Sequence, residues 1–254
     1  MDKKNMNTAA QQPWFRSAAR SLAILILVTL ATGSALAQGL AQSPIDIQAT
    51  DLTIVDNLPS LYFNYDTDVA LTVINTGSPD EFATVRAVVP EGEGKLRVNG
   101  VNYNLLQFHW HTPSEHLIEG RSFPLEMHFV HQATDGSGSL LVVAVLLEHG
   151  PRHAELEKIF AHLPASAGQS TAVGGFDLTQ LLPAGRESFR YTGSLTTPPF
   201  TEGVQFIVLA DSARVSKGQI EAFMSLFPEG NSREPQPLNG RTVRSDIDPE
   251  DEQN

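Results

Sequence analysis

The stretch 107–132, QFHWHTPSEHLIEGRSFPLEMHFVHQ, constrains the fold most. It holds five of the eight histidines of the chain, namely His109, His111, His116, His128 and His131. Residues two apart on a β-strand point to the same face of a sheet. His109 and His111 therefore share a face with Gln107, and His128 shares one with Glu126. If the two strands are neighbours, three imidazoles can converge on one point.

Three neutral imidazoles with an open fourth position are the typical ligand set of a catalytic zinc. A ligating imidazole usually donates its second N–H to an oriented acceptor, and Gln107 and Glu126 stand where they can accept from His109 and His128. The alternative is a set of hydrogen-bonded histidines inside a core. An H-x-H pattern is a weak signal, so these residues alone leave both interpretations open.

The first 37 residues have the composition of a signal peptide. A basic segment is followed by an apolar run over 22–30 and by Ala35-Leu36-Ala37; the basic residues are Lys3, Lys4, Arg16 and Arg20. The apolar run is too short for a membrane span, which needs roughly 18 residues or more. We predict a signal peptide over 1–37, a mature chain over 38–254 and a periplasmic or secreted protein, with no membrane contact after cleavage.

Charge and composition exclude several classes of function. The chain has 17 basic and 29 acidic residues; four and one of these lie in the first 37, so the mature chain keeps 13 and 28 and a net charge of −15. Nucleic acid is thereby excluded as a partner, because phosphate binding needs a basic surface. The chain contains no cysteine. Any metal site must use histidines and carboxylates.

Hydrophobic periodicity predicts one β-rich domain. Strand-like runs cover 70–75, 84–89, 95–98, 105–110, 126–131, 140–147 and 203–209, and helical patterns cover 151–163 and 217–227. Asn99-Gly100 between two alternating runs predicts a β-hairpin. The acidic segment over 245–254 is predicted to be a solvated tail.

A turn-rich segment, YTGSLTTPPFTE over 191–202, predicts by itself only a rigid surface loop. Together with other motifs it makes the chain similar to the alpha-class carbonic anhydrases. The matching pieces, in the order of that family, are QSPIDI (42–47), LLQFHWH (105–111), SEH (114–116), LEMHFVH (125–131), YTGSLTTPP (191–199) and QPLNGR (236–241). They span most of the mature chain.

The resemblance implies a mainly β, single-domain fold, built on a large, twisted, mostly antiparallel central sheet with a few short peripheral helices. It also implies reversible hydration of CO2 to bicarbonate and a proton through a zinc-bound hydroxide. His109, His111 and His128 would bind the Zn²⁺. The substrate would be a small molecule, CO2 or bicarbonate, and both a monomer and a homodimer are compatible with the sequence.

Further roles follow from the same resemblance. Thr196 would orient the hydroxide while donating its own proton to Glu115. The substrate pocket would be formed by Val130, Val143, Leu195, Thr197 and Phe206, each of which could equally be plain core. His116 and His131 are expected to support the site without binding metal. The three remaining histidines, His149, His153 and His162, are expected on the surface.

The sequence departs from the family in two places. Ser78 stands where fast relatives carry a proton-shuttle histidine, and a hydroxyl without a pKa near 7 cannot shuttle protons. The mature chain also lacks the aromatic segment that precedes QSPIDI in most relatives. Two alternatives stay open at this point. One is a non-catalytic extracytoplasmic binding module on the same fold, and the other is a zinc hydrolase of small esters.

Overall fold

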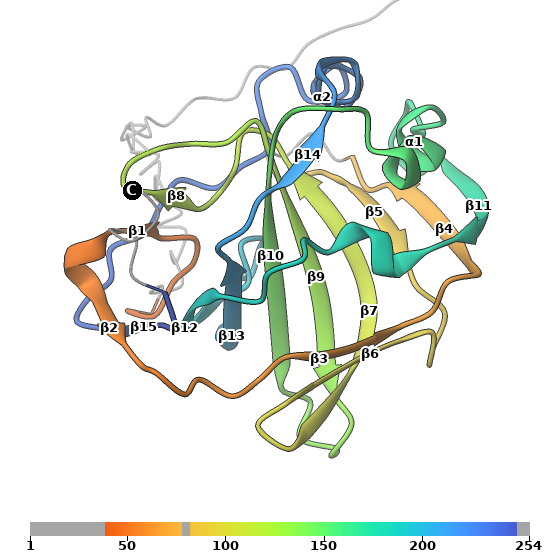
Figure 1. Ribbon diagram of the computed structural model, residues 1–254. Helices are drawn as coiled ribbons and strands as arrows, with labels where there is room; N and C mark the ends of the chain where they lie inside the picture. The colour runs from red at the N-terminus through yellow and green to blue at the C-terminus, as the bar shows by residue number, and fades with distance from the viewer. Residues whose placement is uncertain (1–38, 78–81, 248–254) are drawn as a thin grey trace, which may run out of the picture. The chain divides into compact units, whose positions relative to one another are not determined.

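A thirteen-stranded sheet organises the chain in the computed structural model, which describes residues 39–77 and 82–247 (Figure 1). Its strands are β2 (Leu52–Ile54), β3 (Tyr62–Tyr65), β4 (Val69–Asn75), β5 (Val85–Val88), β6 (Gly94–Val98), β7 (Val101–His111), β9 (Leu125–Ala133), β10 (Leu140–His149), β11 (Ser170–Phe176), β12 (Ser188–Ser194), β13 (Glu202–Leu209), β14 (Ala213–Val215) and β15 (Val243–Ser245). A separate two-stranded sheet pairs β1 (Asp46–Ile47) with β8 (Leu117–Ile118).

The order along the large sheet is β11-β4-β5-β7-β9-β10-β13-β12-β15-β2, with β14 beside β10 and β6 joining β3 to β7. The ladders β10–β13, β10–β14 and β15–β2 are parallel, and the other ladders of this sheet are antiparallel. The mainly β, mostly antiparallel architecture expected from the sequence is confirmed. Each of the seven predicted strand segments overlaps an observed strand.

Two short α-helices, α1 (Ala154–Phe160) and α2 (Lys217–Met224), lie where helical patterning predicts them. Ser216 starts α2 with a capping box that uses Gln219. The helices pack on each other through Phe160 and Phe223, whose rings stack at 6.1 Å. Two 3-10 turns, η1 (Ala49–Asp51) and η2 (Leu178–Leu181), complete the helical content of the described residues. None of these helices has the length and apolar character needed to cross a membrane.

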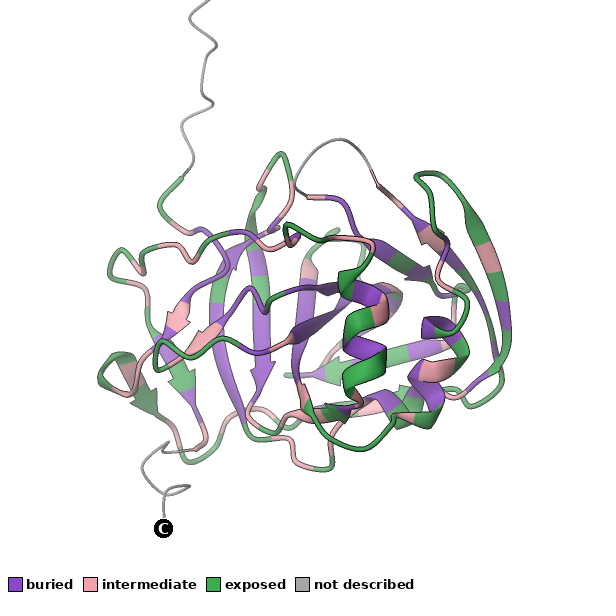
Figure 2. Cartoon of the chain, turned by 90° about the horizontal axis from the view of Figure 1, so that it is seen from above, coloured by how far each residue is buried: buried purple, intermediate pink, exposed green. Residues whose placement is uncertain are grey.

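Apolar side chains cover both faces of the central strands, which are buried over most of their length (Figure 2). One cluster contains Phe108, Phe129 and Val143. The other contains Val142 and Phe206 on the opposite face, because neighbouring residues of a strand alternate. This alternation decides which residues of β7, β9 and β10 face the site.

The tail and the turn-rich loop are shorter than expected. Ser245 is fully buried in β15, where it pairs with Phe189 and Ile54, so the prediction of a tail from residue 245 is wrong. Pairing with neighbouring strands outweighs the acidic composition there. Similarly, β12 runs to Ser194, so only the part of 191–202 from Leu195 on is a loop. Residues 248–254 of the predicted tail and the proposed signal peptide over 1–37 lie outside the described residues.

The turn between β6 and β7 is the predicted hairpin, with Asn99 at φ 50° and Gly100 at φ 77°. Both values are positive, as a type I′ turn requires. We expect Gly100→Ala to lower the free energy of unfolding by about 1 kcal/mol, since a Cβ disfavours the left-handed region. A Cβ would meet nothing within 4 Å at this position, so backbone strain is the whole effect.

Chemical denaturation measures that change. The matched control is Gly174→Ala, since Gly174 has no positive φ and its Cβ would also meet nothing. Reduced freedom of the unfolded chain should leave this control unchanged or slightly more stable. Equal loss of stability in both variants would contradict the role of the turn.

Candidate metal centre

Three histidines on two neighbouring strands form the centre of the site. His109 and His111 extend from β7 and His128 from β9, and the register pairs His109 directly with His128. One ring nitrogen from each lies within 4.8 Å of the other two. His111 and His128 are buried, whereas His109 is half-buried. The structure therefore brings together the three side chains that the alternation of the strands predicts.

The outer nitrogen of each ring has a hydrogen-bond partner. His109 Nδ1 lies 2.9 Å from Gln107 Oε1, and His128 Nε2 lies 2.6 Å from Glu126 Oε1. His111 Nδ1 lies 3.0 Å from the carbonyl oxygen of Asn231. The inner nitrogens are thus His109 Nε2, His111 Nε2 and His128 Nδ1. Asn231 was missed in the sequence, because a backbone carbonyl 120 positions away leaves no sequence signal.

Burial favours the neutral form of two of the three imidazoles, His109 and His111. Loss of hydration lowers the pKa of His109 well below its usual value, and nearby His111 and His128 lower it further. Burial likewise lowers the pKa of His111, although its hydrogen bond with the Asn231 carbonyl raises it in part. The inner His111 Nε2 is buried without a hydrogen-bond partner. An unpaired lone pair beside two other imidazoles fits a metal ion that prefers nitrogen ligands, above all zinc.

Glu126 connects the triad to the interior. Its carboxylate accepts hydrogen bonds from the backbone N–H groups of Glu115 and His116 at 2.8 and 2.7 Å, and it contacts His116 Nδ1 and His128 Nε2 at 2.6 Å. Burial would raise its pKa, yet His116 and His128 hold that pKa well below its usual range. His116, Glu126 and His128 therefore form a hydrogen-bonded cluster instead of a metal site. The ring nitrogens that face Glu126 are engaged in hydrogen bonds with its carboxylate. The other ring nitrogen of His116, Nε2, is hydrogen-bonded with Tyr191 Oη at 2.7 Å.

Glu115 and Thr196 lie beside the triad. Glu115 Oε1 accepts the backbone N–H of Arg233 at 3.0 Å, and Glu115 Oε2 lies 3.8 Å from His128 Nδ1. Burial raises the pKa of Glu115 to about 7, whereas His128, the Arg233 N–H and the Thr196 hydroxyl lower it. Thr196 is itself buried. Loop 195–201 thus brings Thr196 to a carboxylate some eighty positions earlier in the chain.

Three of the five predicted pocket residues, Val130, Leu195 and Phe206, lie on the side of the triad. Val130 shares the face of His128 on β9, and the ring centroid of Phe206 is 5.8 Å from that of His128. Leu195 packs on the same apolar cluster, and Thr197 follows Thr196 in the loop.

The prediction for Val143 is wrong. Val143 pairs with Phe129 and belongs to the core cluster on the opposite face. The neighbouring Val142 pairs with both Val130 and Phe206 and faces the site. A shift of one position moves a strand residue to the other face of its sheet, and the family pattern did not fix this register.

The other five histidines are not part of the triad, although the ring of His116 lies 6.1 Å from that of His128. His116 and His131 are fully buried. His149 and His162 are exposed, as expected. His153 differs from the expectation: it is half-buried and its ring accepts a hydrogen bond from the Leu156 N–H at the start of α1. Ser78, the proposed departure at the proton shuttle, lies outside the described residues.

Acid should destabilise the fold through His131, whose Nε2 lies 2.7 Å from Tyr65 Oη. Burial lowers the pKa of His131 to about 4, against 6.5 when exposed. The contribution of His131 to the free energy of unfolding is therefore fully present above pH 6.5 and is lost as the pH falls toward 4. Over that range the unfolded chain binds a proton at His131, whereas the folded chain does not. The two pKa values correspond to about 3 kcal/mol.

The measurement is the free energy of unfolding between pH 7 and pH 4, for the original chain and for His131→Asn. Both proteins are compared after treatment with a chelator, so that the triad contributes equally. We expect a flatter pH dependence in the variant. Parallel curves would contradict the burial of a neutral His131.

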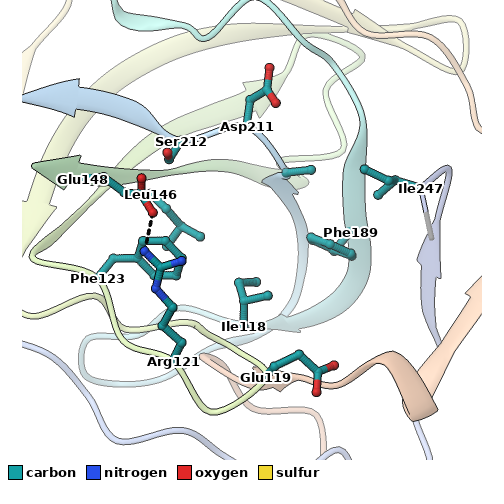
Figure 3. A pocket seen from close by; sticks show the side chains of 11 residues that line it. Ile118, Glu119, Arg121, Phe123, Leu146, Glu148, Phe189, Asp211, Ser212 and Ile247 are labelled. Atoms are coloured by element: carbon teal, nitrogen blue, oxygen red, sulfur yellow. Dashed lines mark hydrogen bonds and ion pairs between the residues drawn. The ribbon is translucent and has the colours of Figure 1, made fainter. Parts of the chain in front are cut away.

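The cavity shown in Figure 3, of about 610 Å³, is separate from the triad. Ile118, Phe123 and Phe189 line its apolar side, and an ion pair of 2.5 Å between Arg121 and Glu148 closes one wall. It contains none of the residues predicted for the site.

The fold and the site together define a class of protein. It is a mainly β protein whose central sheet carries a candidate metal centre of three histidines. A family model for eukaryotic-type carbonic anhydrase matches residues 31–247. The chain therefore belongs to the carbonic anhydrase family, whose enzymes are lyases.

Individual relatives agree with that assignment. The chain is 40% identical to a carbonic anhydrase of Neisseria gonorrhoeae over 81% of this chain and 77% of that one. It is 38% identical to a carbonic anhydrase of Klebsiella pneumoniae over 81% and 80%. Among solved structures, the alpha-carbonic anhydrase of Thermovibrio ammonificans, in complex with sulfanilamide, superposes with a TM-score of 0.74 at 37% identity, covering 81% of this chain and 87% of that chain.

Proposed function

We propose that this chain catalyses the reversible hydration of CO2 to bicarbonate and a proton, with zinc held by His109, His111 and His128. The observation that carries the proposal is the convergence of three imidazole nitrogens within 4.8 Å, with the opposite nitrogens of all three rings hydrogen-bonded. When bound, zinc would supply a water molecule whose pKa the cation lowers to about 7, and so a nucleophile at neutral pH.

Side chains and one backbone carbonyl of the chain would orient the metal ligands and the nucleophile. Gln107, Glu126 and the Asn231 carbonyl fix the orientation of the three rings, which keeps their inner nitrogens free for the metal. Glu115 accepts a hydrogen bond from the Thr196 hydroxyl, so the Thr196 oxygen keeps a lone pair to accept a hydrogen bond from the nucleophile. That hydrogen bond would aim the nucleophile at the carbon of CO2.

The substrate fits the apolar side of the site. Val130, Val142 and Phe206 form a wall without hydrogen-bond donors next to His128. A small neutral molecule such as CO2 loses little hydration on entering such a place, whereas bicarbonate keeps its charge and favours the polar side. Product release is thereby assisted.

The test is a pair of measurements on purified protein. Atomic absorption should find close to one zinc per chain, and stopped-flow assays should show CO2 hydration that a chelator abolishes. Zinc at one per chain without CO2 hydration would instead support a non-catalytic binding module.

We further propose that proton export limits turnover, since Ser78 replaces the shuttle histidine. His116 and His131 are fully buried and hydrogen-bonded, so neither can carry a proton to solvent. We expect an imidazole buffer at constant pH and ionic strength to raise kcat several-fold and to leave kcat/KM unchanged, because proton transfer follows the chemical step. A high kcat that is indifferent to buffer would contradict this proposal.

Export with cleavage after Ala37 is also a proposal, supported by the basic, apolar and A-x-A segments of the first 37 residues. N-terminal sequencing of protein recovered from a bacterial periplasm should begin at Gln38. Recovery of the full chain from the cytosol would contradict it.

A further inference from the structure

Arg86 occupies an unusual place for a cation. Its strand β5 lies inside the sheet, between β4 and β7. Val85 and Ala87 are fully buried, whereas Arg86 and Val88 are exposed, so the second face of β5 is open to solvent. Antiparallel sheets commonly leave one face in water, so a solute can reach this face of β5.

The register places Arg86 next to the metal centre. Arg86 pairs directly with His109, which pairs in turn with His128. Directly opposed residues of an antiparallel pair point to the same face, with Cβ atoms about 4.5–5.5 Å apart. Arg86 therefore stands on the face of the triad, one strand outward from His109.

The charge of Arg86 is a second feature of this position. Arg86 forms no ion pair with another described residue. An uncompensated cation at this point stands out in a mature chain with 28 acidic and 13 basic residues.

We propose that Arg86 forms an anion subsite at the mouth of the metal centre, where its guanidinium binds bicarbonate and other small planar oxyanions. The subsite rests on the proposed function and names the group that recognises the charged product. A guanidinium presents N–H donors in a planar fork that matches two oxygens of such an anion. The exposed neighbours Val88 and Leu106 offer an anion no charge and no side-chain donor.

The experiment compares Arg86→Gln, Arg86→Lys and the control Arg97→Gln. Arg97 is an exposed arginine on β6 that pairs with Asn102, seven positions from His109 along β7 and so roughly 23 Å away. Stopped-flow assays measure inhibition of CO2 hydration by bicarbonate and by nitrate. Titration of the cobalt(II)-substituted protein with nitrate, followed in its visible spectrum, measures anion binding without turnover.

In Arg86→Gln we expect both inhibition constants and the nitrate dissociation constant to rise about three- to tenfold, as for the loss of one charge-assisted hydrogen bond in partly screened surroundings. kcat/KM for CO2 should stay within about twofold, because CO2 is neutral. Arg86→Lys should keep part of the affinity, and Arg97→Gln all of it.

Unchanged anion constants in Arg86→Gln would overturn the subsite, as would an equal rise in Arg97→Gln. Absence of CO2 hydration in the original chain would overturn the proposed function instead. The cobalt titration would still decide whether Arg86 binds anions, so the two failures are distinguishable.

Discussion

His128→Ala should lose both zinc and activity. Removal of one of three ligands leaves two imidazoles, and the two neutral donors that remain, His109 and His111, cannot hold the ion tightly. The Glu126 carboxylate also loses one of its two imidazole partners. We expect zinc content near zero after dialysis and CO2 hydration lower by at least about a thousandfold, because zinc supplies the nucleophile in the proposed mechanism.

The matched control is His149→Ala, because His149 is an exposed histidine at the end of β10. It should retain zinc and full turnover. Circular dichroism establishes that both variants are folded. Retention of one zinc per chain and of the original rate in His128→Ala would refute the assignment of the ligands.

Thr196→Ala should keep the metal and lose most of the rate. Thr196 contributes no metal-binding nitrogen; its hydroxyl interacts with Glu115 and lowers the pKa of that carboxyl. Without the hydroxyl the nucleophile is no longer aimed, and such a preorganised hydrogen bond is worth about 100-fold in kcat/KM. Zinc analysis and stopped-flow CO2 hydration, carried out on the same preparation, measure the two effects separately.

Two further variants sharpen this result. Thr196→Ser keeps a hydroxyl on a smaller side chain and should recover a large part of the rate. Thr192→Ala removes an exposed threonine from the neighbouring strand β12 and should change nothing. Equal losses in the alanine and serine variants would show that Thr196 acts by packing instead of through its hydroxyl.

Local patterns were sufficient for much of the sheet. Alternation of apolar and polar residues located the strands that carry the triad, and Asn99-Gly100 located the hairpin, because both depend on side chains a few positions apart. Short strands such as β1, β8 and β14 were missed, since two or three residues give no measurable period. Ser245 was misjudged because its burial comes from pairing with Phe189 and Ile54, which lie 56 and 191 positions earlier in the sequence.

By itself the sequence located the residues of the candidate metal centre: the period of two in 107–132 places Gln107, His109 and His111 on one face, and Glu126 and His128 on another. Only the tertiary structure decided that the two faces are one, through the register of β7 against β9. It also assigned the pocket to Val142 instead of Val143, supplied the Asn231 carbonyl, and set Arg86 beside His109. The reason is physical: the period of a strand fixes relative direction along the chain, whereas register and long-range pairing depend on how distant segments pack.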